Sequence, residues 1–439
     1  MRSLSLPFIL ATLLVGCPSN PTPDEPGNPS VDGGNQQDAR TDGGHPDDAG
    51  TDGGTEEPLP SGPPVPQGPP NVPEFDPAFP NQTRAPAITS QTEFQVTEVA
   101  SGFRNPWALA FLPDQRMLVT EKPTGSIYVV TQTGAKSPAL TGLPAVDGRG
   151  QGGMLDVELG PDFATSGLIY WTYAEPRAGG NGLAVARGRF VDGASPRVEN
   201  VQVIFRMMPT LESTLHYGGR LVFAPDGTLF VTLGERSVLA GRAQAQDVRS
   251  HFGKVVRINS DGSVPADNPY VNTAGAKPEI WSVGHRNVQS AALDGQGRLW
   301  IVEMGPQGGD ELNRPESGKD YGWPTIGYGE EYSGAPIHES PQAPGMEQPV
   351  YYWDPVIAPS GMTVYTGTLF PEWRNNIFVG ALAGQALVRL RMHDDLVVGE
   401  EHLLTDRNQR IREVAQGPDG ALYLLTDASD GKLLKLTPR

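Results

Sequence analysis

The chain has 439 residues and a formal net charge of −18, from 33 Lys and Arg against 51 Asp and Glu. An acidic balance without a run of basic residues gives no electrostatic footprint for a nucleic-acid backbone, so nucleic acid is excluded as a partner. The single cysteine, Cys17, excludes a disulfide framework or a cysteine-based zinc site within the chain. Gly and Pro together make up 97 residues, about 22% against roughly 12% on average, which favours turns over long helices.

Residues 1–16 have the composition of a bacterial signal peptide. Arg2 precedes an apolar stretch (4–15) that is too short to span a bilayer. The sequence Leu-Val-Gly-Cys that ends at Cys17 resembles the bacterial lipobox, in which removal of the signal leaves an N-terminal, diacylated cysteine. The alternative is an ordinary signal peptide whose removal leaves a free cysteine. The lipobox predicts a bacterial lipoprotein, periplasmic or anchored to the outer membrane.

Residues 17–91 are predicted to be a disordered linker. Between residues 18 and 90 the chain contains 17 Pro, 10 Gly and 12 Asp or Glu, with only two Arg and almost no apolar residues to bury. Such a segment repels itself and cannot offset the entropy lost on ordering. Capture of Ca²⁺ by the Asp-Gly runs is the alternative, but loops of that kind need a longer regular repeat.

One pattern recurs six times in residues 92–439: a turn such as Pro-Asp or Asp-Gly, then a strand of β-forming residues. The turns fall near residues 114, 162, 226, 294, 372 and 419. Their spacings, from 47 to 78 residues, suit four-stranded blades with loop insertions of unequal length. The sequence therefore predicts an all-β fold, a six-bladed β-propeller over residues 92–439. A pair of irregular β-sandwiches is the alternative.

Polar clusters stand beside the repeated strands, where the loops of a propeller converge on its axis. His216 precedes the third repeat, and residues 284–289 place an imidazole, a guanidinium and two amides before the fourth. Arg410 and Arg412 precede the sixth repeat, and strand alternation puts both on one face, where they share an anion or are solvated. The fold by itself gives no activity.

Eight blocks in the same order resemble the soluble PQQ-dependent sugar dehydrogenases, in particular the bacterial aldose sugar dehydrogenase (glucose/sorbosone dehydrogenase) type, over about residues 92–437. The blocks are GFRNPWALAFLPD, GQGGMLDVELGPDF, HYGGRLVFAPDG, GERS with AQDVRSHFGKVVRINSDGSVPADNPY, WSVGHRN, EMGPQGGDELN with GKDYGWP, APSGM and RIREVAQGPDGALYLLTD. The resemblance implies a propeller that holds pyrroloquinoline quinone (PQQ) and Ca²⁺ and oxidises the C1 hydroxyl of an aldose to a lactone. It also implies an external electron acceptor, which the sequence does not identify.

The resemblance implies roles for the clusters. His216 matches the general base that takes the hydroxyl proton while hydride passes to PQQ, and an imidazole with a pKa near 6.5 suits this task. Arg286 and Asn287 match the pair that binds the quinone edge, and Arg286 also matches the group that stabilises developing negative charge.

Three further residues match contacts to the cofactor in this family. Gln151 matches a glutamine that contacts PQQ. Arg410 and Arg412 match the pair that faces the PQQ carboxylates, which would give these two guanidinium groups an anion to share.

Metal ligands are implied in the same way. The main-chain oxygens of Gly305 and Pro306 match those that hold the PQQ-linked Ca²⁺, a cation that prefers oxygen ligands. Glu311 and Tyr321 resemble a second Ca²⁺ site, with Tyr321 acting through its carbonyl. A capped turn with Glu311 solvated is the alternative, and Asp310 could ligate or cap instead.

The chain departs from the family where a lysine is placed against PQQ. At that point it contains Ala381, Leu382 and Ala383, followed by glycine and Gln385. We expect the lost cation to be compensated by main-chain donors of Ala381 to Ala383 or by Gln385.

Other departures bear on the choice of sugar. Met304 and Glu235 stand where the glucose dehydrogenases carry Gln and Asp. Tyr332 is predicted to contact the substrate, and Tyr328 and Trp323 are further aromatic candidates for stacking on a sugar ring.

Two other functions stay open. A Ca²⁺-dependent lactonase-type hydrolase would need carboxylates that converge on the axis. A non-catalytic binding propeller that has lost PQQ is suggested by the missing lysine. The Arg, His and Asn clusters favour the dehydrogenase over both.

The lipobox interpretation predicts the behaviour of Cys17→Ser in the full-length protein. Because serine cannot carry the acyl chains, we expect the variant to move from the membrane fraction to the soluble periplasm. Ser30→Ala, in the same segment, serves as the control that leaves fractionation unchanged. If Cys17→Ser fractionates like the wild type, Cys17 is not an anchor.

Overall fold

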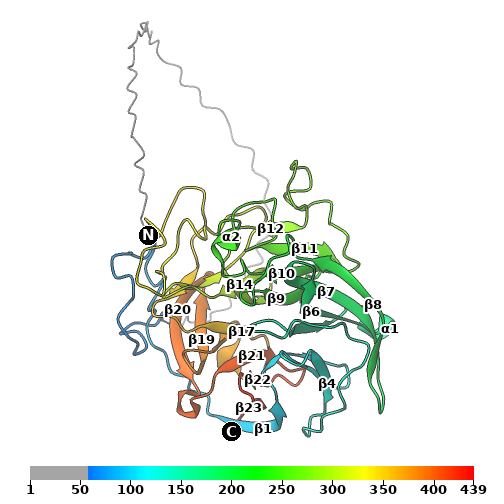
Figure 1. The fold of residues 1–439 in the computed structure, drawn as a ribbon. Helices are drawn as coiled ribbons and strands as arrows, with labels where there is room; N and C mark the ends of the chain where they lie inside the picture. The colour runs from blue at the N-terminus through cyan, green and yellow to red at the C-terminus, as the bar shows by residue number, and fades with distance from the viewer. Residues whose placement is uncertain (1–57) are drawn as a thin grey trace, which may run out of the picture. The chain divides into compact units, whose positions relative to one another are not determined.

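The computed structural model describes residues 58–439, and residues 1–57, which include the predicted signal peptide and Cys17, lie outside the described residues. In the described part, 23 strands form six antiparallel sheets, five of four strands and one of three (Figure 1). Helical structure there is limited to α1 (Phe163–Ser166), α2 (Leu239–Arg242), η1 (Pro371–Trp373) and η2 (Thr405–Arg407). Residues 58–439 contain no helix of the length and hydropathy that a bilayer crossing requires.

Each sheet is one blade, and the blades follow one another along the chain. Blade 1 consists of β2 (Pro106–Phe111), β3 (Met117–Glu121) and β4 (Ser126–Val130). Blade 2 consists of β5 (Met154–Leu159), β6 (Leu168–Arg177), β7 (Gly180–Val191) and β8 (Arg197–Arg206). Blade 3 consists of β9 (Gly218–Phe223), β10 (Thr228–Leu233), β11 (Val255–Asn259) and β12 (Ile280–Ser282). Blade 4 consists of β13 (Val288–Leu293), β14 (Leu299–Glu303), β15 (Asp310–Asn313) and β16 (Tyr351–Trp353). Blade 5 consists of β17 (Pro359–Val364), β18 (Ile377–Ala381), β19 (Ala386–His393) and β20 (Leu396–Leu403). Blade 6 consists of β21 (Ile411–Gln416), β22 (Leu422–Thr426), β23 (Gly431–Pro438) and β1 (Phe94–Phe103).

The first strands of the blades form a ring around the axis. β2, β5, β9, β13, β17 and β21 each contact the next in this order, and β21 contacts β2. Each of the six predicted turns joins the first strand of a blade to the second, as in the β9–β10 and β13–β14 connections. The six-bladed propeller is therefore confirmed, and a pair of packed sandwiches is excluded because the six sheets succeed one another around a single ring.

The ring is closed by strands from the two ends of the described chain. β1 pairs antiparallel with β23, with Phe94 opposite Pro438 and Phe103 opposite Gly431. Figure 1 shows these strands side by side near the C-terminus. The pairing completes blade 6 and covers the ladder groups of β23, which would otherwise form an open sheet edge.

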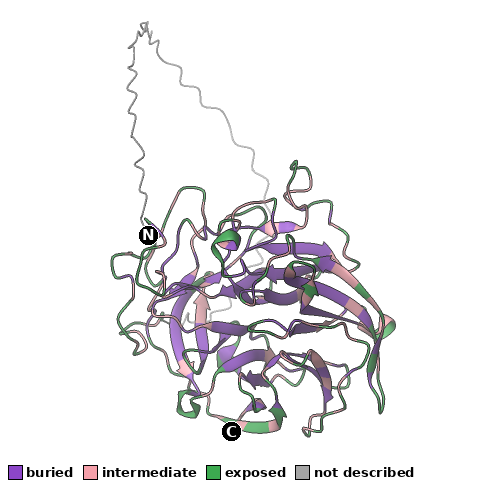
Figure 2. Ribbon diagram, in the orientation of Figure 1, coloured by how far each residue is buried: buried purple, intermediate pink, exposed green. Residues whose placement is uncertain are grey.

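The hydrophobic core lies between neighbouring blades. Trp171 and Tyr173 of blade 2 share one buried cluster with Leu118 and Ile127 of blade 1, and all four are at most 1% exposed. In Figure 2 the strands are mostly buried, while exposed residues lie mainly in loops. Burial of both sheet faces agrees with the near-continuous apolar sequence of the second strands.

The segment 58–91, here called the strap, packs on the propeller, which corrects the predicted disordered linker for these residues. The Asn71 backbone N–H donates to Asp354 Oδ2 at 2.9 Å, and the Ser90 backbone N–H donates to Glu401 Oε1 at 2.7 Å. Gln82 is fully buried. The composition did not reveal that this segment is ordered, because carboxylates of the propeller stabilise it in addition to apolar contacts.

Closure of the ring predicts a large effect for a buried residue of β23. Leu436→Ala removes a side chain that is 0% exposed, and we expect the free energy of unfolding to fall by about 2–5 kcal/mol through lost burial and the cavity left behind. Leu239→Ala, at a position 77% exposed, is the matched control and should change it by less than about 0.5 kcal/mol. Denaturant unfolding measures both. Equal effects of the two changes would contradict a closure that depends on β23.

Candidate active site

The upper rim is the end of the propeller where the first strand of each blade begins and the second strand ends. These strands are antiparallel neighbours, so residues just before β9 or β13 lie beside residues just after β10 or β14. The rim collects the following predicted residues from blades 2 to 6: Gln151, His216, Arg286, Asn287, Gly305, Pro306, Ala381, Leu382, Ala383, Arg410 and Arg412. Separate sequence clusters therefore meet at one end of the molecule.

His216 is held in one orientation at the rim. Its Nδ1 lies 2.9 Å from Glu235 Oε1, and the second Glu235 oxygen accepts the Ser237 backbone N–H at 2.7 Å. The His216 backbone N–H donates to Gln151 Oε1 at 2.8 Å. Gly234 is required beside it, because a Cβ there would lie 2.3 Å from the His216 carbonyl oxygen. A carboxylate on Nδ1 leaves Nε2 as the nitrogen that can accept a proton.

The surroundings of His216 keep its imidazole neutral at neutral pH. The side chain is buried, and burial lowers its pKa below the usual 6.5. The hydrogen bond that His216 donates to Glu235 opposes this shift, while the positive charge of Arg286 lowers the pKa further. The free base, which is the form needed for proton abstraction, therefore predominates.

Arg286 and Asn287 stand just before β13 and contact the loop that follows β14 in the same blade. Nη1 of Arg286 donates to the carbonyl oxygens of Met304 and Gly305 at 2.8 and 2.6 Å. Asn287 is fully buried, and its Oδ1 accepts from Gln289 Nε2 at 3.2 Å. The Gly305 carbonyl predicted to bind Ca²⁺ thus already accepts one hydrogen bond, so an ion would have to share this oxygen or displace Arg286 from it.

Asp427, directly after β22, holds the two predicted arginines together. Its Oδ2 accepts from Nη2 of Arg410 at 2.9 Å and from Nη2 of Arg412 at 3.1 Å, and its Oδ1 accepts from Asn105 Nδ2 at 3.2 Å. Arg412 of blade 6 also donates to Gln289 Oε1 of blade 4 at 3.2 Å. Burial would raise the pKa of Asp427, but the charge of Arg412 and the hydrogen bond from Arg410 hold it well below its usual range. The arginines thus share a carboxylate of the chain itself.

Glu311 and Tyr321 line one enclosed cavity of about 20 Å³, which is the size of one water molecule. Glu311 Oε2 accepts from Asn313 at 2.9 Å, and burial together with the charge of Glu303 raises the pKa of Glu311 well above 4.5. The Tyr321 hydroxyl donates to the Arg314 carbonyl at 2.7 Å, which leaves the main-chain oxygen for an ion. Within residues 58–439 no three His, Cys, Asp or Glu residues are grouped to hold a metal, so an ion here would depend on main-chain oxygens.

The loop after β18 uses two of the donors that were expected to compensate for the missing lysine. The Leu382 N–H donates to the Ala358 carbonyl and the Ala383 N–H to the Ile357 carbonyl, both at 3.0 Å. Ala381 is fully buried at the end of its strand. Two of the main-chain donors predicted from sequence are therefore already used, and a contribution from Gln385 stays a prediction.

Of the three aromatic candidates for sugar stacking, Tyr332 has the accessible ring. It is 72% exposed, whereas Tyr328 is buried and stacks on Tyr352 with ring centroids 3.8 Å apart. Trp323 is buried with the guanidinium of Arg286 5.3 Å from its ring centroid. Tyr328 is therefore not available as a platform for a sugar.

Sequence reasoning noted Glu235 only as a departure from the glucose dehydrogenases and missed Glu303 and Asp427, so it assigned no positioning role to these carboxylates. Glu303 Oε1 lies 2.8 Å from Nδ1 of His285, while Glu235 and Asp427 hold His216 and the arginine pair. All three carboxylates stand at or just after the end of a second strand, in VTLGE, IVEMG and LLTD. The acidic residue that recurs at the end of these three repeated strands was the available signal.

The axis below the rim also carries carboxylates, which bears on the hydrolase alternative. Arg220 pairs with Asp156 at 3.0 Å and with Glu413 at 2.7 Å, all three being buried. Burial raises the pKa of Glu413 to about 7 and, together with the charge of Asp156, raises that of Glu158 well above 4.5. These groups are neutralised by a guanidinium or by protonation, which is not the free carboxylate set that a hydrolytic metal requires.

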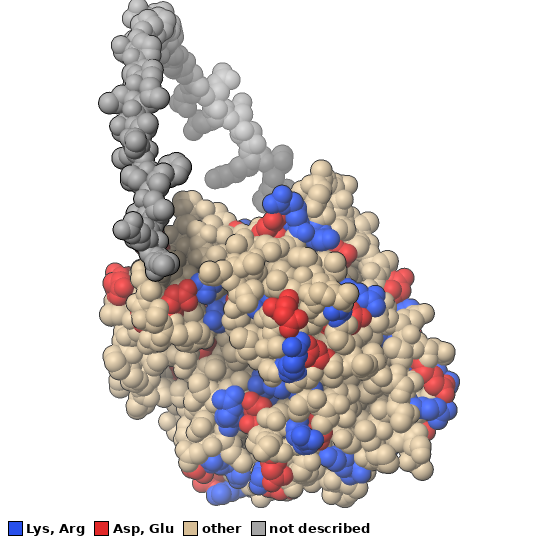
Figure 3. Space-filling model, viewed as in Figure 1, with Lys and Arg blue, Asp and Glu red and all other residues tan. Residues whose placement is uncertain are grey.

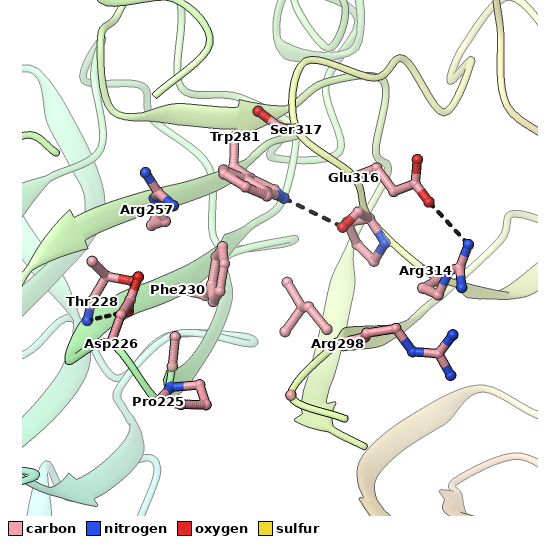
Figure 4. A pocket seen from close by; sticks show the side chains of 14 residues that line it. Pro225, Asp226, Thr228, Phe230, Arg257, Trp281, Arg298, Arg314, Glu316 and Ser317 are labelled. Atoms are coloured by element: carbon pink, nitrogen blue, oxygen red, sulfur yellow. Dashed lines mark hydrogen bonds and ion pairs between the residues drawn. The ribbon is translucent and has the colours of Figure 1, made fainter. Parts of the chain in front are cut away.

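Away from the rim, charged groups pair locally. Figure 3 shows basic and acidic side chains interspersed over one face. A cleft of about 480 Å³ between blades 3 and 4 lies at the opposite end of the blades, since Asp226 of the β9–β10 turn lines it (Figure 4). Two of its arginines, Arg298 and Arg314, both pair with Asp395, at 2.6 and 2.7 Å. We assign no chemistry to this cleft.

Residues 103–435 match the family model for glucose/sorbosone dehydrogenase. The chain belongs to the glucose/sorbosone dehydrogenase family. Aldose sugar dehydrogenase YliI of Escherichia coli K12 is 45% identical over 340 residues, which cover 76% of this chain and 90% of that protein. The soluble aldose sugar dehydrogenase (Asd) of E. coli in its apo-form has a TM-score of 0.76 at 43% identity and covers 79% of this chain and 100% of its own. The PQQ-bound aldose sugar dehydrogenase (Adh) of Streptomyces coelicolor has a TM-score of 0.65 at 28% identity, with 80% and 100% covered.

This family member should lose stability when Asp427 becomes Asn. The change leaves Arg412 without its charged partner, so we expect the free energy of unfolding at pH 7 to fall by about 1–3 kcal/mol. Because the folded-state pKa of Asp427 is depressed, its stabilisation is complete above the usual value of 3.8 and is lost as the pH falls below it.

Denaturant unfolding at pH 7 and at pH 3 measures this effect, with exposed Asp430→Asn as the control. The difference between Asp427→Asn and the wild type should be smaller at pH 3. A difference that does not change with pH would contradict the assignment of Asp427 as the charged partner.

Proposed function

We propose that this protein is a PQQ- and Ca²⁺-dependent aldose sugar dehydrogenase that oxidises the C1 hydroxyl to a lactone and passes electrons to an external acceptor. The observation that carries the proposal is the rim geometry: a neutral His216 oriented by Glu235, with Arg286 close enough to lower its pKa. Family membership and the PQQ-bound Streptomyces relative support the same chemistry.

The rim fits an anionic ligand rich in hydrogen-bond acceptors. Among the described residues, the Nε atoms of Arg286 and Arg412 are buried and have no hydrogen-bond partner. Buried donors left unpaired are costly, so a ligand that accepts from them is favoured. Arg286, Asn287 and Arg412 would hold the cofactor, with Gln151 at its edge. The carbonyls of Gly305 and Pro306 would face its metal ion.

When bound, PQQ would supply the two-electron acceptor for the hydride that leaves C1. The proton of the C1 hydroxyl is accepted by Nε2 of His216. The Glu235 carboxylate at Nδ1 stabilises the imidazolium that results. The Arg286 guanidinium lies where negative charge develops and stabilises it without reorganisation. Tyr332 is exposed, and in this proposal it contacts the sugar from the solvent side.

Reconstitution tests the proposal. The cofactor-free protein is mixed with PQQ and Ca²⁺, and reduction of an artificial dye is followed with a panel of aldoses, with EDTA-treated protein as the control. We expect dye reduction that needs both PQQ and Ca²⁺. No dye reduction with any sugar, together with no PQQ retained on the protein, would overturn the proposal and favour the non-catalytic propeller.

His216→Ala tests the assignment of the base. Because the change removes the proton acceptor and none of the arginine contacts, turnover should fall about 10²- to 10⁴-fold with PQQ still bound. Steady-state kinetics measures the fall, and retained PQQ absorbance controls for folding. Turnover equal to that of the wild type would remove His216 from the mechanism.

Glu235→Gln tests how the base is oriented. Glu235 raises the pKa of His216, so its loss should move the acidic limb of the kcat/KM profile to lower pH while kcat falls, because the histidine is less firmly oriented. An acidic limb that stays in place would show that Glu235 does not act through His216. Glu331→Gln, on a carboxylate paired with Arg242, is the control and should leave that limb unchanged.

A further inference from the structure

The strand register gives blade 1 a rim position equivalent to those of Met304 in blade 4 and Asp427 in blade 6. The first residue of the inner strand faces the last residue of the second strand in blades 1, 4 and 6, as shown by the pairs Pro106–Glu121, Val288–Glu303 and Ile411–Thr426. The next residue along the chain is therefore equivalent in all three blades. These residues are Lys122, Met304 and Asp427.

Main-chain contacts hold Lys122 between two parts of the site. Its N–H donates to the Asn105 carbonyl at 3.2 Å, and the Asn105 side chain donates to Asp427 Oδ1 at 3.2 Å. Its carbonyl accepts the Met154 N–H at 2.9 Å, three residues after Gln151. Lys122 thus lies beside both the Asp427 group and the Gln151 turn.

The charges around Asp427 do not balance. Lys122, Arg410 and Arg412 act electrostatically on one another there, and Asp427 is the carboxylate that acts on both Lys122 and Arg412. Glu413 also acts on Arg412, but it is paired with Arg220 at 2.7 Å. Both Asp427 oxygens already accept hydrogen bonds, from the two arginines and from Asn105. Within residues 58–439 the Lys122 ammonium has neither a hydrogen bond nor an ion pair, although its side chain is partly buried. Burial and the nearby charge of Arg412 lower the pKa of Lys122.

We propose that Lys122 is a cofactor-binding residue, which supplies from blade 1 a third cation for the carboxylate groups of PQQ. The proposal rests on the function proposed above. It accounts for the absence of a lysine after β18, where the Leu382 and Ala383 N–H groups are occupied. An ammonium on the blade 1 side and two guanidinium groups on the blade 6 side would contact a polycarboxylate from two directions.

Binding of PQQ to the cofactor-free full-length protein tests the proposal without depending on turnover. Lys122→Met keeps the length of the side chain and removes the charge, and we expect its Kd for PQQ, from quenching of tryptophan fluorescence, to rise about 10- to 100-fold. Lys122→Arg should keep the Kd within a few-fold of the wild type. Lys432→Ala, which removes a lysine paired with Glu98, is the matched control and should bind as the wild type does.

The free energy of unfolding of the cofactor-free variants distinguishes PQQ binding by Lys122 from a purely structural role of this residue. Loss of an unpaired cation should leave it unchanged or raise it in Lys122→Met, whereas loss of a structural contact would lower it along with PQQ affinity and so overturn the proposal. Wild-type affinity in Lys122→Met would overturn this inference alone. Failure of the wild type itself to bind PQQ would overturn the proposed function and this inference with it.

Discussion

The hydrogen-bond register between the first and second strands of each blade is the constraint on which the site depends. It places the start of one strand beside the end of the next in every blade, so the functional residues need no long loops to reach one another. The β1–β23 pairing makes this possible by closing the ring and fixing the distance between blades 6 and 1. Closure therefore brings Asn105 of the first blade within hydrogen-bond distance of Asp427 of the last.

Charge compensation is the second organising feature of the rim. Two basic groups of the rim are matched to a carboxylate that follows a second strand: His216 to Glu235, and Arg412 to Asp427. These carboxylates orient the basic groups without saturating them, since the Arg412 Nε atom stays unpaired. The site can therefore accept an anion and is also stable without one, because the carboxylates offset part of the free-energy cost of burying these basic groups.

The strap adds an element outside the part of the chain that matches the family model, which begins at residue 103. The Tyr328 hydroxyl donates to Gln82 Oε1 at 3.2 Å, and Tyr328 also lines the small cavity beside Gly305 and Glu311. The strap thus supports the wall of the site from behind. Its ordering depends on carboxylates from distant parts of the sequence, such as Asp354.

The sequence by itself determined the six repeats, the all-β propeller and the order of the clusters, because turn chemistry and strand composition are local properties. It also named His216, Arg286 and Arg412, which the structure brings to one rim. Only the tertiary structure decided which carboxylate serves which cation, that the Leu382 N–H is already used, that Tyr328 is covered and that residues 58–91 are packed. Pairs such as His216 with Glu235 and Arg412 with Asp427 lie within one blade and are brought together by strand register, whereas residues 58–91 depend on remote partners such as Asp354. In each case the partner is set by the folded arrangement of the strands and not by neighbours in the sequence.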